Sequence, residues 1–339
     1  MKIGNFDIDK KVLIVAEIGN NHEGDFELAK EMIDAAAEAG ADAVKFQTFR
    51  TEHYINKLEQ QRFSRLKSFE LDFFQFEKLS NFAKERGLFF ISTPFDLGSA
   101  KALSNFVDVL KISSSDNNFF PLIEAITGYN LPVILSTGLL DLKGIHKTIG
   151  IFEKAWSRDF VEKNLALLHC VCSYPVPIKE ANLLAIKSLQ EEYTFSIGYS
   201  DHVIGNDAAI ISVALGSRII EKHFTLDHNL SDFHDHKISA NIPEMKDLVS
   251  RIRNAEALLG DGLKKAETCE TKIVDLVRRS IVVNRDMAAG ECVKLEDLSW
   301  VRPAGGIAPG NEELIVGKFL KKDLSSGDQI NELDLETTS

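Results

Sequence analysis

Two short polar stretches that each end an apolar run have the residue types of a metal site. They are GYSDH at 198–202 and EKHF at 221–224. If the two apolar runs are neighbouring parallel strands, His202 and His223 lie side by side. A pair of neutral imidazoles suits a divalent transition metal and leaves coordination positions open for substrate and water. The alternative is that each histidine only ends a strand with a satisfied hydrogen bond.

Most other apolar runs of the chain also end in polar residues. Glu17 ends the first run, and Lys45 and Gln47, two residues apart, share one face of the second. Further polar groups follow the later runs: Thr93, Lys111, Ser114, Ser136, His169, Cys172, Tyr174, Ser200 and Asp201. Taken singly, each is ordinary at a strand end or in a turn. Together, two lysines and several hydroxyls would bind a small, highly charged anion, and Glu17 would be the one carboxylate free to act as acid or base.

Two thiols close to this set are not expected to share a metal ion. Cys170 and Cys172 are expected on opposite faces of their strand. His234 and its neighbours follow the last run in a polar loop and are interpreted as surface or substrate-loop residues.

The polar residues need a scaffold that brings the ends of many strands together. Apolar, β-branched runs alternate with helical patterns, which is typical of βα units around a parallel sheet. Eight runs begin at Val12, Ala41, Leu88, Val107, Leu131, Leu165, Thr194 and Ser217. Helical patterns cover 25–40, 72–87, 97–106, 118–130, 141–156, 181–193, 206–216 and 242–260. Eight such units in about 260 residues predict an α/β fold of the (β/α)8 TIM-barrel type, whose catalytic residues stand at the C-terminal strand ends. A doubly wound open sheet is the alternative, but no glycine-rich dinucleotide fingerprint follows the first run.

Two parts of the chain do not fit the βα repeat. Residues 49–71 are too long for an ordinary βα loop, so we expect an excursion over the barrel mouth. After Gly260 the helical pattern ends, which divides the chain into a catalytic domain at 1–260, a linker at 261–279 and a small β-rich domain at 280–339. Short β-like pieces occur there, SIVVN at 280–284 and ELIVGKFL at 313–320. An internal echo, RDMAAGE at 285–291 and KDLSSGD at 322–328, predicts two related half-units. A domain of about 60 residues buries little surface alone and is expected to dock on something.

Composition and charge restrict the partners. The 339 residues carry a formal net charge of −12, which argues against nucleic acid or an anionic membrane surface. Four cysteines form no even framework, and neither a leader pattern nor an apolar span of about 18 residues occurs. These features predict a reduced, cytoplasmic protein.

The motifs at the strand ends carry a family resemblance. They are AEIGNNHEGD at 16–25, DAVKFQT at 42–48, FISTPF at 90–95, LKIS at 110–113, PVILSTG at 132–138, LLHCVCSYP at 167–175, GYSDH at 198–202 and EKHFTLD at 221–227. In this order they resemble the sialic acid (N-acetylneuraminate) synthases and the related legionaminic and pseudaminic acid synthases. The tail from Arg279 to Leu335 resembles the antifreeze-like (SAF) domain of these enzymes.

The resemblance implies an activity, a cofactor and roles for single residues. The implied reaction condenses phosphoenolpyruvate with an open-chain N-acyl hexosamine, depends on Mn²⁺ or Mg²⁺, and releases phosphate. His202 and His223 match the metal ligands, and Glu17 matches the glutamate that handles a proton. The groups expected to bind phosphoenolpyruvate are Lys45, Thr93, Lys111, Ser114, Ser136 and Ser200. Positions near the sugar or the metal are matched by Gln47, Tyr174, Asp201 and Asp235. Arg302 matches an arginine that reaches the sugar's N-acyl group across a domain-swapped homodimer.

The sequence departs from the family pattern at three places on the sugar side. Residues 231–237 replace a more usual PGPDHK-like stretch, Cys172 replaces Asn or Ser, and Asp116 stands where several relatives have Glu. These departures leave the identity of the acceptor open, either N-acetylmannosamine or a 2,4-diacetamido-trideoxyhexose. One alternative is a 3-deoxy-ulosonate phosphate synthase that acts on a sugar phosphate. The other is a non-catalytic sugar-binding barrel.

Overall fold

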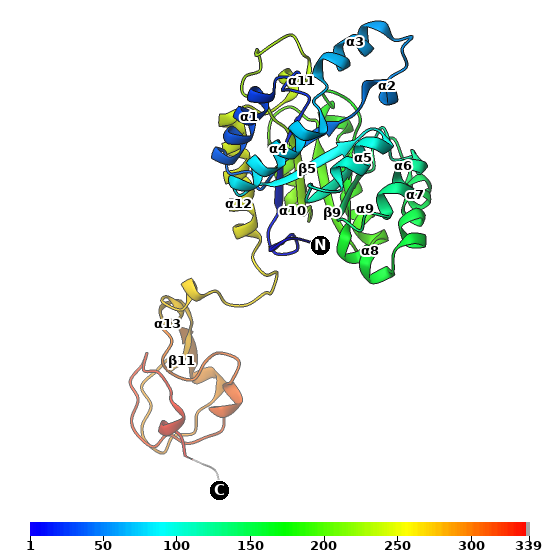
Figure 1. Cartoon of the computed structure of the whole chain (residues 1–339). Coiled ribbons are helices and arrows are strands. Elements are labelled where there is room, and N and C mark those ends of the chain that lie inside the picture. Colours follow the sequence, from blue (N-terminus) through cyan, green and yellow to red (C-terminus); the bar gives the residue numbers. More distant parts are fainter. Residues whose placement is uncertain (337–339) are drawn as a thin grey trace. The chain divides into compact units, whose positions relative to one another are not determined.

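The computed structural model describes residues 1–336 and divides into two compact units, Met1–Asp261 and a smaller one that begins at Gly262 (Figure 1). Eight parallel strands of the first unit close into a barrel in the order β10-β3-β4-β5-β6-β7-β8-β9. They are β3 (Leu13–Gly19), β4 (Ala43–Thr48), β5 (Phe89–Pro94), β6 (Val109–Ile112), β7 (Val133–Ser136), β8 (Leu165–Cys170), β9 (Ser196–Asp201) and β10 (Ile219–His223). Each predicted apolar run forms one of these strands, and the prediction of a (β/α)8 TIM barrel is confirmed.

Helices follow the strands around the outside of the barrel. They are α1 (Phe26–Glu38), α4 (Phe73–Glu85), α5 (Leu97–Leu103), α6 (Phe120–Thr127), α7 (Leu142–Ala155), α8 (Arg158–Asn164), α9 (Ala185–Glu192), α10 (Asp207–Ala214) and α12 (Ile242–Leu259). Polar caps start several of them: Asp25 accepts two backbone N–H groups of α1, and Asp72 and Asn241 form capping boxes. The predicted helical pattern at 141–156 is followed by a second short helix, α8, that the periodicity did not indicate.

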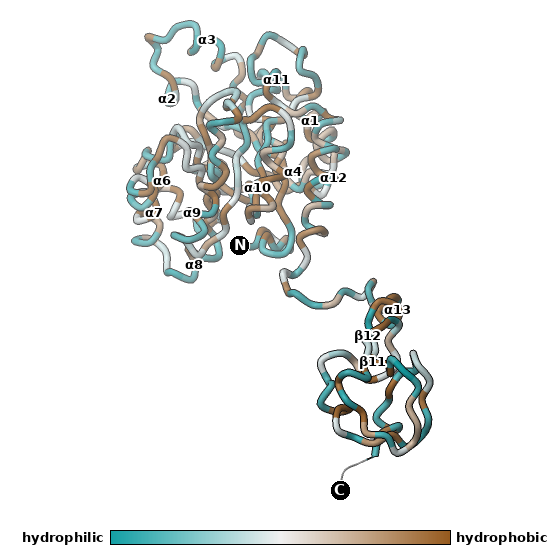
Figure 2. The backbone as a smooth tube through the Cα atoms, turned by 180° about the vertical axis from the view of Figure 1, so that it is seen from behind, coloured by the Kyte–Doolittle hydropathy of each residue, from teal (hydrophilic) through white to brown (hydrophobic). Residues whose placement is uncertain are grey.

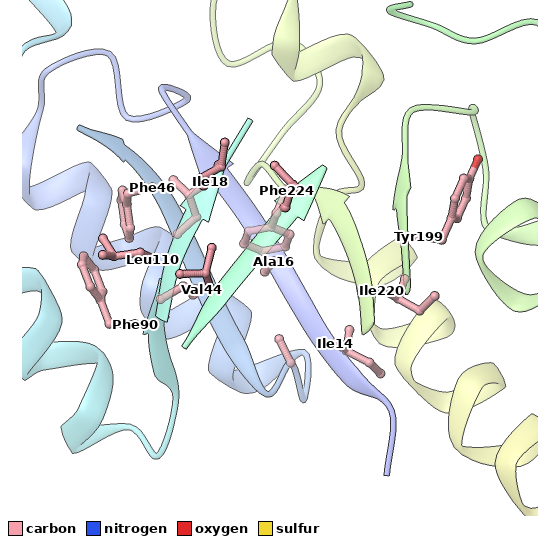
Figure 3. Close-up of a cluster of buried hydrophobic side chains, with 14 of the residues drawn as sticks. Ile14, Ala16, Ile18, Val44, Phe46, Phe90, Leu110, Tyr199, Ile220 and Phe224 are labelled. Carbon is pink, nitrogen blue, oxygen red and sulfur yellow. The ribbon is translucent and has the colours of Figure 1, made fainter. Parts of the chain in front are cut away.

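Side chains that face the barrel interior change from apolar to polar along the strands. Leu13, Val15, Ala43, Ile91, Val109, Ile134, Ala166, Leu168 and Ile219 form the apolar layer. Met1, Ile3 and Ile8 join this layer from an N-terminal hairpin of β1 (Lys2–Ile3) and β2 (Phe6–Asp7), which sequence analysis missed. The alternate strand residues, such as Ile14, Ala16 and Val44, point outward and pack with the helices (Figure 3). The apolar layer therefore closes one end of the barrel, and polar side chains are left for the other end.

The long segment after β4 stands at the polar end of the barrel, which confirms the predicted excursion over the mouth. It contains α2 (Thr51–Tyr54) and α3 (Gln60–Phe69), and in Figure 1 α3 lies at the same end of the barrel as α11 (Asp235–Ile238). In Figure 2 hydrophobic stretches gather in the centre of the barrel, whereas α3 is largely hydrophilic. Glu70 closes the excursion at its base, because its carboxylate accepts bonds from the Thr51 backbone N–H and hydroxyl at 2.9 and 2.8 Å.

The second unit has a core of its own around two antiparallel strands, β11 (Ser280–Val283) and β12 (Leu298–Val301). The predicted internal echo appears as reciprocal bonds: the Ala289 N–H donates to Asp323, and the Ser326 N–H donates to Asp286. The prediction of a strand at 313–320 is wrong. A 3-10 turn, Glu312–Leu314, occupies its start, the turn continues to Gly317 with a φ of 85°, and isolated bridges follow at Phe319 and Leu320.

Within residues 1–336, none of the helices combines the length and the hydrophobicity needed to cross a membrane.

Candidate active site

A pocket of about 340 Å³ lies at the C-terminal ends of the barrel strands. All eight strands, or the residues that directly follow them, contribute to its lining. The predicted site residues that line it are Glu17, Lys45, Gln47, Thr93, Lys111, Ser114, Ser136, Tyr174, Ser200, His202, His223 and Asp235. The apolar-to-polar change along each strand explains this gathering, because inward alternation continues from the apolar layer into these residues.

Two predicted site residues do not line this pocket. Asp201 points outward on β9, opposite Lys222 of β10, and accepts a 2.8 Å bond from the Lys222 ammonium group. The structure therefore does not bring Asp201 into the pocket, because strand alternation places its neighbours Ser200 and His202 inside instead. Arg302 belongs to the second unit, where it is exposed directly before Pro303.

Two lysines and two carboxylates form the pocket floor. The Lys45 ammonium nitrogen lies 3.0 Å from Glu17 Oε2 and 3.5 Å from Glu221 Oε2. Lys111 donates to the Ser136 hydroxyl at 2.6 Å and lies 3.8 Å from Glu221 Oε1, which also accepts from Ser200 at 2.9 Å. All four charged groups are buried, so they interact in a medium that screens charge weakly.

Glu221 is a second inward carboxylate that sequence analysis missed. The signal was present, because Glu221 precedes His223 by two residues and alternation puts both on one face. In the parallel register, His223 lies directly beside Glu17 of β3, which draws β3 and β10 into one cluster.

The environments of the two carboxylates separate their pKa values. Burial raises the pKa of Glu17, and the negative charge of Glu221 adds to this effect against the attraction of Lys45. Burial also opposes the charge on Glu221, but Lys111 and Lys45 outweigh it and lower the pKa of Glu221 to about 2. Glu17 is thus the group able to exchange a proton, while Glu221 stays ionised.

His202 and His223 face each other, with ring centroids 5.5 Å apart. His202 Nδ1 lies 2.9 Å from the Val171 carbonyl oxygen, so Nδ1 carries the proton and Nε2 keeps its lone pair. Burial lowers the pKa of His223, and its buried Nδ1 has no hydrogen-bond partner among residues 1–336. Two facing imidazoles, one with an unpartnered ring nitrogen among the described residues, fit a shared metal ion.

The remaining coordination positions of such an ion are not filled by the chain. Within the described residues, no group of three or more His, Cys, Asp or Glu side chains has the arrangement of a metal site. Tyr174 covers the histidines from one side, with its ring centroid 4.2 Å from that of His202 and 5.9 Å from that of His223. The pair would therefore leave positions open for oxygen ligands from water or substrate.

The thiols lie differently from the prediction. Cys170 and Cys172 both line the pocket, and the expectation of opposite faces is wrong, because residues two apart along an extended chain point to the same side. The Cys170 thiol bonds the Cys172 sulfur and, with further donors nearby, lowers the pKa of Cys172 to about 6. His169 was expected among the mouth residues but points outward, where its Nε2 lies 2.9 Å from the Ala181 carbonyl oxygen.

The excursion supplies lining residues that sequence analysis did not identify. Tyr54, Arg62, Arg65 and Leu66 contribute to one side of the pocket. Tyr54 stacks on Phe95 with ring centroids 4.4 Å apart. A long loop predicts an excursion but gives no contact pairs, so only the packing shows which of its side chains reach inward.

Comparison with known proteins gives matches to both units. The NeuB family model matches residues 32–264, and the SAF domain model matches residues 278–336. The N,N'-diacetyllegionaminic acid synthase of Legionella pneumophila is 40% identical over 328 residues, which are 93% of this chain and 92% of that protein. The pseudaminic acid synthase of Campylobacter jejuni is 34% identical over 349 residues, covering 98% and 99% of the two chains.

A solved structure also resembles this chain. The N-acetylneuraminic acid (sialic acid) synthetase of Leptospira borgpetersenii, determined in complex with citrate, superposes with a TM-score of 0.75 at 37% sequence identity. The match covers 80% of this chain and 94% of the Leptospira chain.

Proposed function

Because this chain belongs to the NeuB family, we propose that it condenses phosphoenolpyruvate with the open-chain aldehyde form of an N-acyl hexosamine and releases phosphate. One observation carries the proposal: a floor of two lysines adjoins a pair of facing imidazoles and a carboxylate of raised pKa, all inside one pocket. The floor suits the anion, the imidazoles suit a metal, and the carboxylate suits proton transfer.

Phosphoenolpyruvate would bind at the floor. Its carboxylate and phosphate need cations and hydroxyl donors, which Lys45, Lys111 and Ser136 provide together with Thr93, Ser114 and Ser200. Lys111 is held toward the pocket by Ser136, and burial lowers the pKa of its ammonium group. The negative charge of a bound anion would offset the free-energy cost of burying the charged Lys111 ammonium group. The floor therefore suits a bound anion better than water.

The reaction forms one carbon–carbon bond and breaks one carbon–oxygen bond. The C2–C3 double bond of phosphoenolpyruvate supplies the electron pair with which C3 attacks the aldehyde carbon, and the aldehyde oxygen takes a proton. Water then adds at C2 and loses a proton. The tetrahedral intermediate collapses to a ketone as the C2–O bond breaks and phosphate leaves. Holding both reactants in one dry pocket supplies much of the acceleration of such a two-substrate step.

Glu17 would move the proton in this sequence. Its carboxylate is fixed by Lys45 at 3.0 Å and by the Gln47 amide, which donates to Oε1 at 3.2 Å. A raised pKa makes the carboxylate a better base for the attacking water and allows it to return the proton to the departing phosphate. Glu221 would stay ionised and orient the two lysines.

His202 and His223 would hold a divalent ion, Mn²⁺ or Mg²⁺ by the family resemblance. When bound, the ion would polarise the aldehyde oxygen as a Lewis acid. The tautomer of His202 is already set for this by the Val171 carbonyl oxygen. Tyr174, packed on both imidazoles, would limit the positions in which the aldehyde end of the acceptor can lie.

The acceptor would lie between the histidines and the excursion. Gln47 and Asp235 line this part of the pocket, and Asp235 is held by His234 at 2.7 Å. We place a 2,4-diacetamido-trideoxyhexose ahead of N-acetylmannosamine, because the legionaminic acid synthase of Legionella is 40% identical to this chain.

We also propose a domain-swapped homodimer in which Arg302 of one subunit serves the pocket of the other. We propose further that the protein works in the cytoplasm, which keeps the four free cysteines reduced.

An acceptor screen tests the proposed function. Protein loaded with Mn²⁺ is given phosphoenolpyruvate and, separately, N-acetylmannosamine, 2,4-diacetamido-2,4,6-trideoxymannose or the corresponding altrose. We expect phosphate release only with an N-acyl hexosamine, and a product whose mass equals both substrates plus water minus phosphate. Phosphate release with a simple sugar phosphate, but with none of these acceptors, would instead favour a deoxy-ulosonate phosphate synthase. No release with any acceptor and several metals would reject the proposal.

A further inference from the structure

Two arginines at the pocket rim are not used by the reaction as described. Arg62 and Arg65 lie three residues apart on α3, so both project from the same face of the helix toward the pocket that they line. Both side chains are exposed. Arg62 lies beside the Tyr54 hydroxyl, and within residues 1–336 neither guanidinium forms an ion pair with a carboxylate.

The charges below the rim are already matched. Lys45 and Lys111 on the floor face Glu17 and Glu221, which gives two ammonium groups against two carboxylates. Asp235, the other carboxylate of the lining, lies 2.7 Å from the His234 imidazole and contributes no positive charge. The unpaired positive charge of the lining therefore stands at its outer edge, on Arg62 and Arg65.

The rest of the chain repels anions. Its formal net charge is −12, so a small anion that approaches the protein meets an unfavourable field over most of the surface. A pair of exposed guanidinium groups in the pocket lining opposes that field locally. Guanidinium also matches carboxylate and phosphate oxygens with paired hydrogen bonds, which a lysine cannot offer.

We propose that Arg62 and Arg65 form a capture site for phosphoenolpyruvate at the rim, from which the anion passes to Lys45 and Lys111 on the floor. The inference rests on the proposed function, because it assumes that phosphoenolpyruvate is a substrate. The uncharged N-acyl hexosamine gains nothing from two cations, so the pair serves one of the two substrates and not the other.

The position of α3 makes the pair a fixed feature of the mouth. Phe69, at the end of α3, packs edge-on against Phe233 with ring centroids 5.2 Å apart. Glu70 ties the base of the excursion to Thr51 and to Arg50, the latter at 2.8 Å. Both attachments lie at the C-terminal end of α3 and involve neither Arg62 nor Arg65, so exchange of the two arginines for glutamine leaves these anchoring contacts in place.

The experiment compares Arg62→Gln/Arg65→Gln with Lys78→Gln/Lys143→Gln. The control removes the same charge from exposed lysines of α4 and α7 that do not line the pocket. At low salt we expect the arginine variant to lose about tenfold or more in kcat/KM for phosphoenolpyruvate, the lower end of electrostatic steering effects. Its kcat and its KM for the acceptor should stay within about twofold of the unmodified protein, because rim charges act on association.

Salt dependence and a conservative variant separate capture from structural damage. Raising salt from about 0.01 M to about 1 M shortens the screening length from about 30 Å to about 3 Å, so the unmodified protein should approach the arginine variant in kcat/KM. Arg62→Lys/Arg65→Lys should keep most of the low-salt rate. Equal losses in the lysine control, or a loss confined to kcat or to the acceptor KM, would overturn the capture site.

Calorimetry with phosphoenolpyruvate alone distinguishes this inference from the proposed function. If Arg62→Gln/Arg65→Gln binds phosphoenolpyruvate with the same affinity as the unmodified protein and has the same kcat/KM, the capture site is rejected. The proposed function would still stand. A failure of phosphoenolpyruvate to bind the unmodified protein would reject both.

Discussion

Glu17 and Glu221 lie on adjacent barrel strands and share the ammonium group of Lys45, yet their pKa values move in opposite directions. Burial raises the pKa of Glu17, whereas Lys111 and Lys45 lower that of Glu221 to about 2 against the effect of burial. Glu17 therefore gains a proton first as pH falls. If it is the base for water, kcat decreases on the acid side at a pH above the ordinary range of a glutamate.

We expect Glu17→Gln to lower kcat by about 10²–10⁴ and to remove this acid limb, since its side chain cannot accept the proton. Glu221→Gln should keep the limb but move it to lower pH, because the charge of Glu221 contributes to the raised pKa of Glu17. Full pH profiles of kcat check both results. An acid limb that Glu17→Gln leaves in place would assign the proton transfer to another group.

Asp201 offers a test of its reassignment from the sugar side to the barrel wall. Asp201→Asn would leave the buried Lys222 ammonium group with carbonyl acceptors but no counter-ion. Removing one partner of a buried pair costs about 3–5 kcal/mol, which denaturant unfolding would measure. The KM for the acceptor should be unchanged in the protein that stays folded.

Asp235→Asn is the matched control for Asp201. Its side chain lines the pocket and is only partly buried, so we expect a raised acceptor KM with little loss of stability. A stable Asp201→Asn protein with a raised acceptor KM would return Asp201 to the sugar site.

If His202 and His223 hold the metal ion, substitution of either histidine should remove it. His223→Ala should abolish metal retention and activity with the fold intact, because one imidazole alone is a weak site. His228→Ala is the control, since His228 binds only Glu244 at the surface at 3.0 Å. Metal content per chain and circular dichroism report the outcome, and chelation should inactivate the unmodified protein until Mn²⁺ or Mg²⁺ returns. Unchanged metal content in His223→Ala would place the ion elsewhere.

Arg302 tests the shared site in the proposed dimer. Arg302→Ala and Glu17→Ala proteins should each be nearly inactive, and mixing them with subunit exchange should restore part of the activity, because one mixed pocket then has both residues. A tag on one variant reports whether the subunits exchange. If they exchange and no activity returns, a role of Arg302 across subunits is contradicted.

The sequence predicted the barrel because the eight apolar runs and their helices repeat at one spacing. Strand alternation also placed Lys45, Gln47 and His223 on the inner face. The same rule identifies Glu221 as inward and Asp201 as outward, a distinction that the residue types at the strand ends do not give. The same rule places Cys172 on the face of Cys170, because the two residues are two positions apart, and both line the pocket.

The inward-facing residues of the excursion and the backbone of the tail depend on tertiary packing, so local sequence patterns did not predict them. Arg62 and Arg65 lie on a hydrophilic helix whose inner face depends on Phe69 meeting Phe233, a contact over a long sequence separation that no local pattern encodes. The tail motif at 313–320 has a strand-like composition, but its residues up to Gly317 form turns. The turn therefore forms there despite the strand-like composition.

The fate of the oxygen atom of the attacking water, followed with an isotope label, is the most direct test of the proposed condensation. The reaction is run in ¹⁸O-labelled water with phosphoenolpyruvate, metal and the accepted N-acyl hexosamine, and the released phosphate is analysed by mass spectrometry. The account predicts acceptor-dependent phosphate without label, because water adds at C2 and the C2–O bond breaks. Label in the phosphate would show that water attacked phosphorus, and would contradict the condensation assigned to this pocket.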